Sequence, residues 1–264
     1  MPGYAIPRLG FGVYKNYTTT ESVIEALKAG YRHIDTAQAY RNEAHVGAAL
    51  RNFGIKRQEV FITTKIISRH HGREKTMRIV ETSLDNIGGG YIDLFLIHDP
   101  YAGTKLRLET YKALQDCRRE GKIRSVGVSN YGVKHLEEIR EAGYEAPSVN
   151  QIELHPFCQQ RPIVEYCRKN NIVVSAYSPL VHGRIDHAVF RDIANKHSKD
   201  AAQILIRWSL QKGFVPLPKS ATPARIHSNT QVYDFKLDQD DMERMDALDM
   251  GKNGAVTWNP VDVD

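Results

Sequence analysis

Cysteine is scarce in this sequence, and the few cysteines that occur are not grouped. There are three, Cys117, Cys158 and Cys167, and no two of them form a CxxC pair. An odd number of cysteines without metal-ligand spacing indicates free thiols in a reducing compartment. We therefore expect buried thiols and no metal site, rather than a disulfide framework or a zinc centre.

Long apolar runs and targeting segments are also missing. No stretch approaches the roughly 18 apolar residues that a membrane-spanning helix needs. The opening residues MPGYAIPRLG lack the apolar core of a secretory signal. These absences predict a cytoplasmic protein that has no membrane partner.

Basic residues are in slight excess but form no block. There are 36 lysines and arginines against 31 acidic residues, which gives a net charge of +5. Scattered bases argue against a nucleic-acid partner and leave room for an anionic ligand. Low-complexity linkers are absent too, so we expect one globular domain that covers residues 1–264.

What the sequence does contain is a regular alternation of short apolar runs and longer amphipathic segments. The apolar runs predict strands at 9–13, 33–35, 60–65, 92–98, 125–129, 148–153, 172–177 and 214–217. The amphipathic segments predict helices at 20–29, 43–52, 74–87, 108–119, 133–142, 162–170, 188–197, 201–211, 223–231 and 239–248. We expect Thr20 to cap the first helix and Pro162 to occupy the first position of its own.

Eight strand–helix units in about 250 residues favour a (β/α)8 TIM barrel, an α/β fold. A doubly wound open sheet would give the same alternation, but no GxGxxG motif enters a helix. In a barrel of this kind the chemistry lies at the carboxyl ends of the strands. The polar residues at those ends are Asp35, Lys65, His98, Ser129 with Asn130, Gln151 with Glu153, Tyr177, and Lys219 with Ser220.

Three of these residues end successive strands, which lie about 5 Å apart in a sheet. They are Asp35, Lys65 and His98, and Tyr40 follows in the loop after Asp35. A lysine beside a tyrosine hydroxyl lowers the pKa of the phenol, and a histidine can hydrogen-bond a carbonyl oxygen. Each residue alone fits a structural role: a turn cap, a solvated edge, a core histidine. Their coincidence predicts a proton donor with electrophilic support, suited to reducing a carbonyl.

The segment after the last strand has the composition of a phosphate site. Lys219, Ser220 and Arg225 offer an ammonium, a hydroxyl and a guanidinium close to a helix start. An exposed basic helix start is the structural alternative. Tyr177 could stack on a flat ring or simply pack in the core.

Three segments resemble signatures of the aldo-keto reductase family. They are GYRHIDTAQAYRNEAHVG, GKIRSVGVSNY and LPKSATPARIHSNTQV, and they occur in the family's order over essentially the whole chain. The resemblance implies an NADPH-dependent reductase on a (β/α)8 barrel. The implied reductase acts on a small-molecule carbonyl substrate, and we expect a monomer.

Carried over position by position, the resemblance implies a set of site residues. The catalytic set is Asp35, Tyr40, Lys65 and His98. The residues implied for NADPH binding are Gly12, Val13, Tyr14, Asp35, Ser129, Asn130, Gln151, Tyr177, Ser178, Leu180, Lys219, Ser220, Arg225 and Asn229. Those implied for substrate binding are Tyr14, Tyr40, His98 and Asp99. The basic segment is implied to hold the 2′-phosphate, which favours NADPH over NADH.

Two departures from the family pattern concern the substrate pocket. Asp99 follows the catalytic histidine where an aromatic residue is usual, which predicts a more polar pocket. The tail after Leu248 is short, which predicts a more open pocket that only Trp258 could cover.

Two other functions remain open at this point. One is a non-catalytic NADPH-binding member of the same scaffold, although such a role has no need of Lys65 or His98. The other is a metal-dependent barrel hydrolase that uses His33, Asp35, His98 and Asp99, which leaves the basic segment unexplained. The natural substrate does not follow from the sequence.

Overall fold

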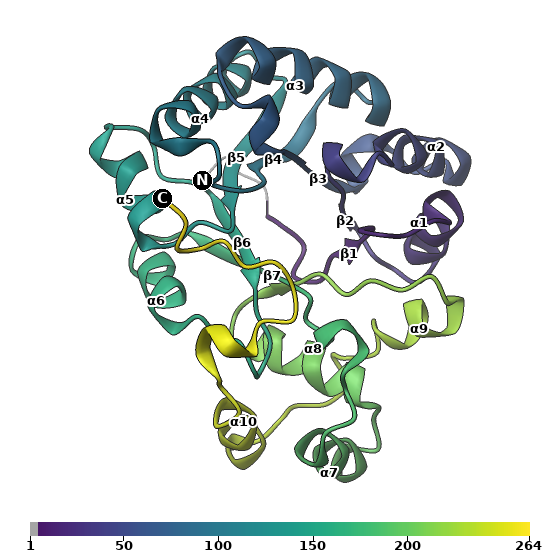
Figure 1. Cartoon of the computed structure of the whole chain (residues 1–264). Helices are drawn as coiled ribbons and strands as arrows, with labels where there is room; N and C mark the ends of the chain where they lie inside the picture. Colours follow the sequence, from purple (N-terminus) through teal and green to yellow (C-terminus); the bar gives the residue numbers. More distant parts are fainter. Residues whose placement is uncertain (1–4) are drawn as a thin grey trace.

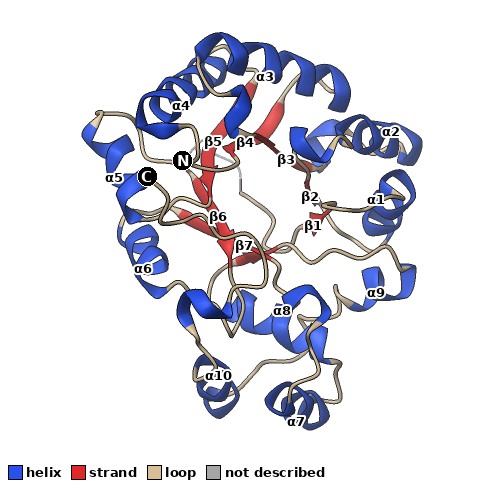
Figure 2. Cartoon of the chain, in the orientation of Figure 1, coloured by secondary structure: helices blue, strands red, loops and turns tan. Residues whose placement is uncertain are grey.

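The computed structural model describes residues 5–264 and shows a closed barrel of parallel strands inside a ring of helices (Figures 1 and 2). The strands are β1 (Phe11–Gly12), β2 (His33–Asp35), β3 (Phe61–Ile66), β4 (Ile92–Ile97), β5 (Ile123–Ser129), β6 (Val149–Glu153), β7 (Val173–Tyr177) and β8 (Val215–Pro216). They pair in sequence order, each parallel to the next. The predicted (β/α)8 barrel is confirmed.

The helices lie on the outside of the barrel. They are α1 (Thr19–Lys28), α2 (Glu43–Phe53), α3 (Arg73–Ile87), α4 (Gly103–Arg119), α5 (Val133–Glu141), α6 (Arg161–Lys169), α7 (Ala188–His197), α8 (Ala201–Gln211), α9 (Pro223–Ser228) and α10 (Gln239–Asp246). Strands such as β4 are buried along their whole length, as expected for a sheet covered on both sides. This double burial explains why the strands read as apolar runs.

The barrel closes between its two shortest strands. The amide of Gly10 donates to the carbonyl of Pro216 at 3.0 Å, and that of Gly12 donates to Pro218 at 3.0 Å. A Cβ on Gly12 would lie 3.3 Å from the Leu217 carbonyl oxygen, so a side chain there would crowd the seam. We call this junction of β1 and β8 the seam.

Two details of the helix starts differ from the sequence-based expectation. Thr20 is the second residue of α1 and not its cap, because Asn16 organises this start instead: its side-chain oxygen accepts the Thr18 amide at 3.1 Å. Pro162 follows Arg161 and is therefore the second residue of α6. By contrast, the predicted cap Asp200 is confirmed, since it accepts the Gln203 amide at 2.8 Å.

No helix among the described residues is both long and apolar enough to cross a membrane. The three cysteines are buried free thiols, as expected.

Because all eight strands are parallel, their carboxyl ends lie together and place one set of polar residues around the barrel mouth.

Candidate active site

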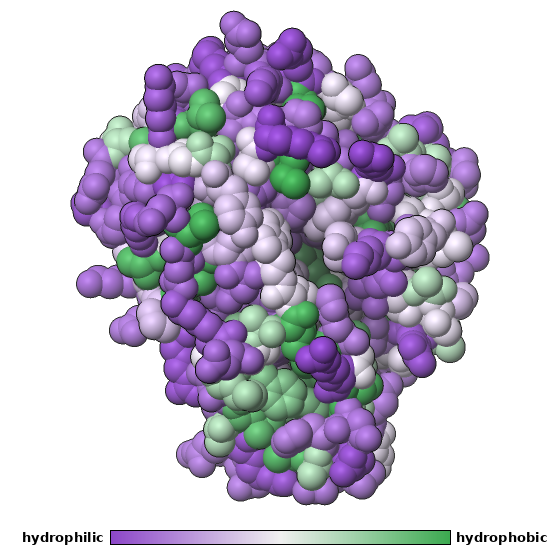
Figure 3. Space-filling model, in the orientation of Figure 1, coloured by the Kyte–Doolittle hydropathy of each residue, from purple (hydrophilic) through white to green (hydrophobic). Residues whose placement is uncertain are grey.

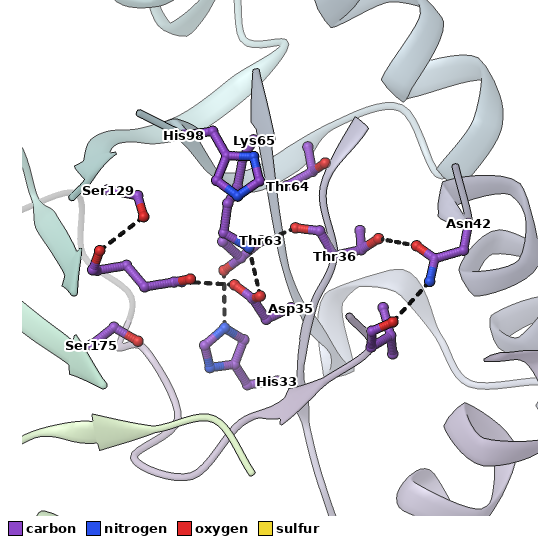
Figure 4. A network of polar contacts seen from close by, with 12 residues as sticks. His33, Asp35, Thr36, Asn42, Thr63, Thr64, Lys65, His98, Ser129 and Ser175 are labelled. Atoms are coloured by element: carbon purple, nitrogen blue, oxygen red, sulfur yellow. Dashed lines mark hydrogen bonds and ion pairs between the residues drawn. The ribbon is translucent and has the colours of Figure 1, made fainter. Parts of the chain in front are cut away.

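A buried ion pair lies at the centre of the barrel mouth. The Lys65 ammonium, at the end of β3, donates to Asp35 Oδ1 at 2.6 Å and to the Thr36 carbonyl at 2.8 Å (Figure 4). The Lys65 side chain is fully buried. Burial lowers the pKa of Lys65, and the Asp35 charge opposes that shift. The second Asp35 oxygen accepts the Gln151 side-chain amide at 2.8 Å.

Tyr40 reaches this pair from a short 3-10 helix after β2, Gln38–Tyr40. The helix ends at Arg41, which adopts a left-handed φ of 58°. The next residue, Asn42, is buried and ties this loop to the neighbouring one: its amide donates to the Val13 carbonyl at 3.0 Å, and its oxygen accepts the Thr36 hydroxyl at 2.7 Å. The Asn42 contacts fix the loop that carries Tyr40.

The Tyr40 ring is surrounded by the other expected catalytic residues. Lys65 Nζ lies 5.1 Å from its ring centroid, and the His98 ring packs edge-on at 5.6 Å. The Tyr14 ring lies 5.0 Å away on the outer side. The structure thus brings Asp35, Tyr40, Lys65 and His98 together.

The sequence-based expectation for the Tyr40 pKa is wrong in direction. Burial, together with the Asp35 charge, raises the pKa of the Tyr40 phenol well above its usual value of 10. The reason is that Lys65 spends its hydrogen bonds on Asp35 and the Thr36 carbonyl and none on the phenol. Tyr40 is therefore a protonated phenol at neutral pH.

His98 is neutral in this setting. Burial, together with the nearby Lys65 charge, lowers the pKa of His98 to about 3. Its backbone carbonyl accepts the Asn130 side-chain amide at 3.0 Å. A neutral imidazole beside the Tyr40 ring can donate a hydrogen bond without carrying charge.

The ends of β5, β6 and β7 form a polar shelf of Ser129, Asn130, Gln151 and Tyr177. The Ser129 hydroxyl donates to the Gln151 carbonyl at 2.8 Å, and the Tyr177 hydroxyl donates to Asn130 Oδ1 at 2.8 Å. Asn130 holds a left-handed φ of 60° and is buried, with its amide bonded to the His98 carbonyl. The Gln151 side-chain oxygen accepts no hydrogen bond from residues 5–264, so one amide acceptor remains open on the shelf.

The other residues expected at the cofactor surround the same end of the barrel. Gly12 ends β1 and Val13 follows it, and the Val13 amide donates to the Asp35 carbonyl at 3.0 Å. Ser178, with a left-handed φ of 50°, begins the loop after β7 that leads to Leu180. These backbone positions border the shelf.

The predicted phosphate segment follows β8. Lys219 and Arg225 are exposed, and neither forms an ion pair within the described part of the chain. Ser220 is buried, and its hydroxyl accepts the Thr222 amide at 3.0 Å. Asn229 is buried one turn beyond Arg225. The segment therefore offers two unpaired cations at one edge of the mouth.

Asp99 takes a different place from the one expected. It is fully buried, and its carboxylate accepts the backbone amides of Ser68 and Tyr101 at 3.2 Å each. These contacts join the loops after β3 and β4. The expectation of a polar pocket wall at Asp99 is corrected, because the charge is used inside the protein.

The tail brings Trp258, the residue that the sequence offered as a cover, to the pocket. Figure 1 shows it in yellow, crossing in front of β6 and β7, and Figure 3 shows the same face hollowed near its centre. The Trp258 ring lies 6.0 Å from the His98 ring, edge to face, and stacks on Tyr101 at 5.8 Å. Tyr101 is a site residue that the sequence-based reasoning missed, since an aromatic residue in a loop carries no signal of its contacts.

The metal-hydrolase alternative finds no support. His33 bonds the Thr63 hydroxyl at 2.9 Å, Asp35 holds Lys65, and Asp99 holds backbone amides. Among residues 5–264 only three aspartates at the start of α10 have a spacing that could suit a metal ion: Asp238, Asp240 and Asp241. That cluster belongs to the start of α10 and not to the barrel mouth.

Comparison with known proteins agrees with this geometry. The profile of the aldo/keto reductase family matches residues 9–250. The glyoxal reductase of Bacillus subtilis is 42% identical over 98% of this chain and 94% of its own length. The methylglyoxal reductase DkgA of Escherichia coli is 41% identical, over 95% of this chain and 92% of its own. A Bombyx mori aldo-keto reductase, solved in complex with NADP, superposes with a TM-score of 0.90 at 33% identity, over 98% of this chain and 93% of that one.

An α/β barrel with a buried aspartate–lysine pair under a tyrosine defines the class as an oxidoreductase. The chain belongs to the aldo/keto reductase family, whose members reduce carbonyl compounds with NADP(H).

Proposed function

We propose that this protein reduces aldehydes and ketones to alcohols with Tyr40 as the general acid, assisted by Lys65, Asp35 and His98. The observation that carries the proposal is the fully buried Lys65 ammonium, 2.6 Å from Asp35 and 5.1 Å from the Tyr40 ring. A buried charge is costly unless it is paired and hydrogen-bonded, and the bonds of Lys65 to Asp35 and the Thr36 carbonyl meet that condition. A developing phenolate on Tyr40 is a further use of that charge that this site offers.

The direction of the Tyr40 pKa shift identifies the source of the proton that is transferred. The raised pKa keeps the Tyr40 phenol protonated at neutral pH, so it has a proton to give. As that proton moves to the carbonyl oxygen, negative charge grows on the phenol oxygen near Lys65. The fixed ammonium stabilises that charge without moving, because Asp35 already holds it in place.

His98 orients the substrate in this proposal. Its imidazole is neutral, and a neutral N–H can donate to the carbonyl oxygen beside Tyr40. Two donors that converge on one oxygen select a single orientation of the carbonyl. NADPH, when bound, supplies the hydride that reaches the carbonyl carbon.

The residues around the mouth fit an NADPH molecule. The open Gln151 oxygen suits an amide N–H of a carboxamide. The unpaired cations Lys219 and Arg225 suit the 2′-phosphate, with the Ser220 hydroxyl between them in the chain. Tyr177 stands at the shelf as a candidate stacking partner for a flat ring, while its hydroxyl bonds Asn130.

Short carbonyl compounds are the substrates that we propose. The glyoxal and methylglyoxal reductases named above act on small 2-oxoaldehydes, and both align over nearly the whole chain. The mouth is lined by the rings of Tyr14, Tyr40 and Trp258, and it lacks the Asp99 charge. A panel of aldehydes, ketones and sugars, followed by loss of NADPH absorbance and repeated with NADH, tests this proposal. No turnover of any member would overturn it.

The second candidate is a non-catalytic NADPH-binding member of the scaffold. The unpaired cations would serve such a role, but the buried lysine and the neutral histidine would not. NADPH binding without turnover across the panel would favour this candidate.

A further inference from the structure

The tail contains a segment, residues 255–263, that crosses the barrel mouth and is fastened on both sides. We call it the strap. In Figure 1 it leaves the region of α10, passes β6 and β7 and ends beside α5. Trp258 lies between the two fastenings, and 43% of it is exposed. The fastenings therefore decide where its ring can lie.

The first fastening is Glu153, the last residue of β6, which is fully buried. Its carboxylate accepts the Val256 amide at 2.6 Å, the Thr257 amide at 3.2 Å and the Thr257 hydroxyl. His155 Nε2 adds a contact at 2.8 Å. Burial acts against ionisation, but these hydrogen bonds outweigh it, and the pKa of Glu153 lies below its usual value. The carboxylate is thus a fixed acceptor at neutral pH.

The second fastening is at the start of α5. His135 Nδ1 accepts the Gly132 amide at 3.1 Å, so its Nε2–H donates to the Val263 carbonyl at 2.7 Å. A Cβ on Gly132 would lie 2.1 Å from the Val261 carbonyl oxygen. The strap therefore packs against this turn with no room for a side chain.

Trp258 is held between these two points. Its carbonyl oxygen lies 2.9 Å from the Tyr177 hydroxyl, whose single proton is shared between this carbonyl and Asn130 Oδ1. Its indole N–H donates to the Tyr101 hydroxyl at 2.7 Å. The ring then faces the His98 ring edge-on at 6.0 Å. One side of the pocket over His98 is made by a residue whose backbone is anchored elsewhere.

We propose that Glu153 is a positioning residue for substrate selection: it fixes Trp258 over His98 and so sets the affinity for aromatic aldehydes without touching them. This inference rests on the proposed reductase function, because the substrate is placed by Tyr40 and His98. A flat aromatic aldehyde bound there would pack on the indole, whereas glyoxal is too small to depend on it.

The first test is steady-state kinetics of Glu153→Gln with NADPH and two substrates. The glutamine side chain has one acceptor oxygen in place of two. Its NH2 group would face the backbone N–H groups of Val256 and Thr257, which are also donors. We expect the KM for 4-nitrobenzaldehyde to rise roughly three- to tenfold, the span of an aromatic contact. The kcat for glyoxal should stay within about twofold, since the substituted residue lies outside the catalytic set. Equal losses for both substrates would overturn the proposal.

A double-mutant cycle separates positioning from a purely structural role. Trp258→Ala should raise the KM for 4-nitrobenzaldehyde by a similar factor, and adding Glu153→Gln to it should change little more. Additive effects would overturn the proposal. Glu74→Gln, on the exposed face of α3, is the matched control for loss of one carboxylate.

Indole quenching tests the anchor without turnover. The chain has two tryptophans, and Trp208 is buried. The Trp258→Phe variant therefore gives the fluorescence of Trp208 alone, which is subtracted. Acrylamide should quench Trp258 more strongly in Glu153→Gln than in the unchanged protein, and equal quenching would overturn the anchor. If the unchanged protein reduced no aldehyde, the proposed function would fail while this measurement still decided the anchor. If Glu153→Gln does not fold, Thr257→Val removes the hydroxyl contact from a partly exposed position and takes its place in both tests.

Discussion

The Asp35–Lys65 pair shows how a single residue's role depends on its partners. Alone, a lysine at a strand end reads as a solvated edge residue, but here its charge is buried and held at 2.6 Å from a carboxylate. Breaking a buried pair by removing one partner leaves an uncompensated charge. The pair is thus a structural feature of the barrel mouth, and its charges also set the electrostatic potential around Tyr40 and His98.

Replacing Tyr40 tests the proton donor. We expect Tyr40→Phe to lose at least about 100-fold in kcat, the lower range for general acid catalysis, because the ring stays but the proton is gone. NADPH affinity, measured by fluorescence titration, should be nearly unchanged. Tyr17→Phe is the matched control, since Tyr17 is 93% exposed. Full activity in Tyr40→Phe would contradict the mechanism.

The basic segment can be tested by comparing the two cofactors. Lys219→Ala with Arg225→Ala removes both unpaired cations, and each hydrogen bond to a charged group contributes about 1.5–3 kcal/mol. The Kd for NADPH should rise by about 100-fold or more, while that for NADH changes little. Lys75→Ala with Arg78→Ala, exposed on α3, keeps the charge loss equal. Equal weakening of both cofactors would refute the 2′-phosphate site.

At the scale of elements, the loop between β2 and α2 depends on Asn42. Its bonds to the Val13 carbonyl and the Thr36 hydroxyl join two loops of the mouth. We expect Asn42→Ala to lower the free energy of unfolding by about 1–3 kcal/mol and to lower kcat, because Tyr40 loses its support. Urea unfolding and steady-state kinetics measure both effects. Asn195→Ala, exposed on α7, should change neither; an unchanged kcat in Asn42→Ala would show that Tyr40 is held by other contacts.

The sequence predicts elements whose signal is local and misses features that depend on packing. The strand ends Asp35, Lys65 and His98 follow from chain pattern, and the structure brings them together. The buried carboxylate of Asp99 does not follow, because its partners, the Ser68 and Tyr101 amides, come from loops without a pattern. The sequence marks Trp258 as a residue that could cover the pocket, but no local rule gives its contact with the His98 ring.

On the scale of the whole molecule, buried histidines make stability depend on pH. Burial lowers the pKa of His33 and His71 to about 4 and that of His98 to about 3. In the unfolded chain each has a pKa of about 6.5, so between these values the unfolded state binds more protons. Stability is therefore full above about pH 6.5 and falls as the pH drops toward 4.

His71→Leu tests this dependence away from the catalytic set. It should reduce the slope of unfolding free energy between pH 6 and 4.5 by up to about 1.4 kcal/mol per pH unit, the contribution of one proton. Urea midpoints at several pH values measure the slope. His45→Gln, at an exposed position on α2, should leave the slope as it is, and an unchanged slope in His71→Leu would contradict the assignment.

The hydrogen bonds of the seam between β1 and β8 make local opening of the barrel measurable. Proline has no amide hydrogen, so Pro216 and Pro218 can only accept, and the two bonds across the seam come from Gly10 and Gly12. Deuterium uptake at those two amides therefore reports opening of the ring at this one joint. Val13 and Tyr14 follow Gly12 directly in the chain. Opening of the seam would therefore free the loop that carries Tyr14, beside Tyr40, while the other strands stay paired.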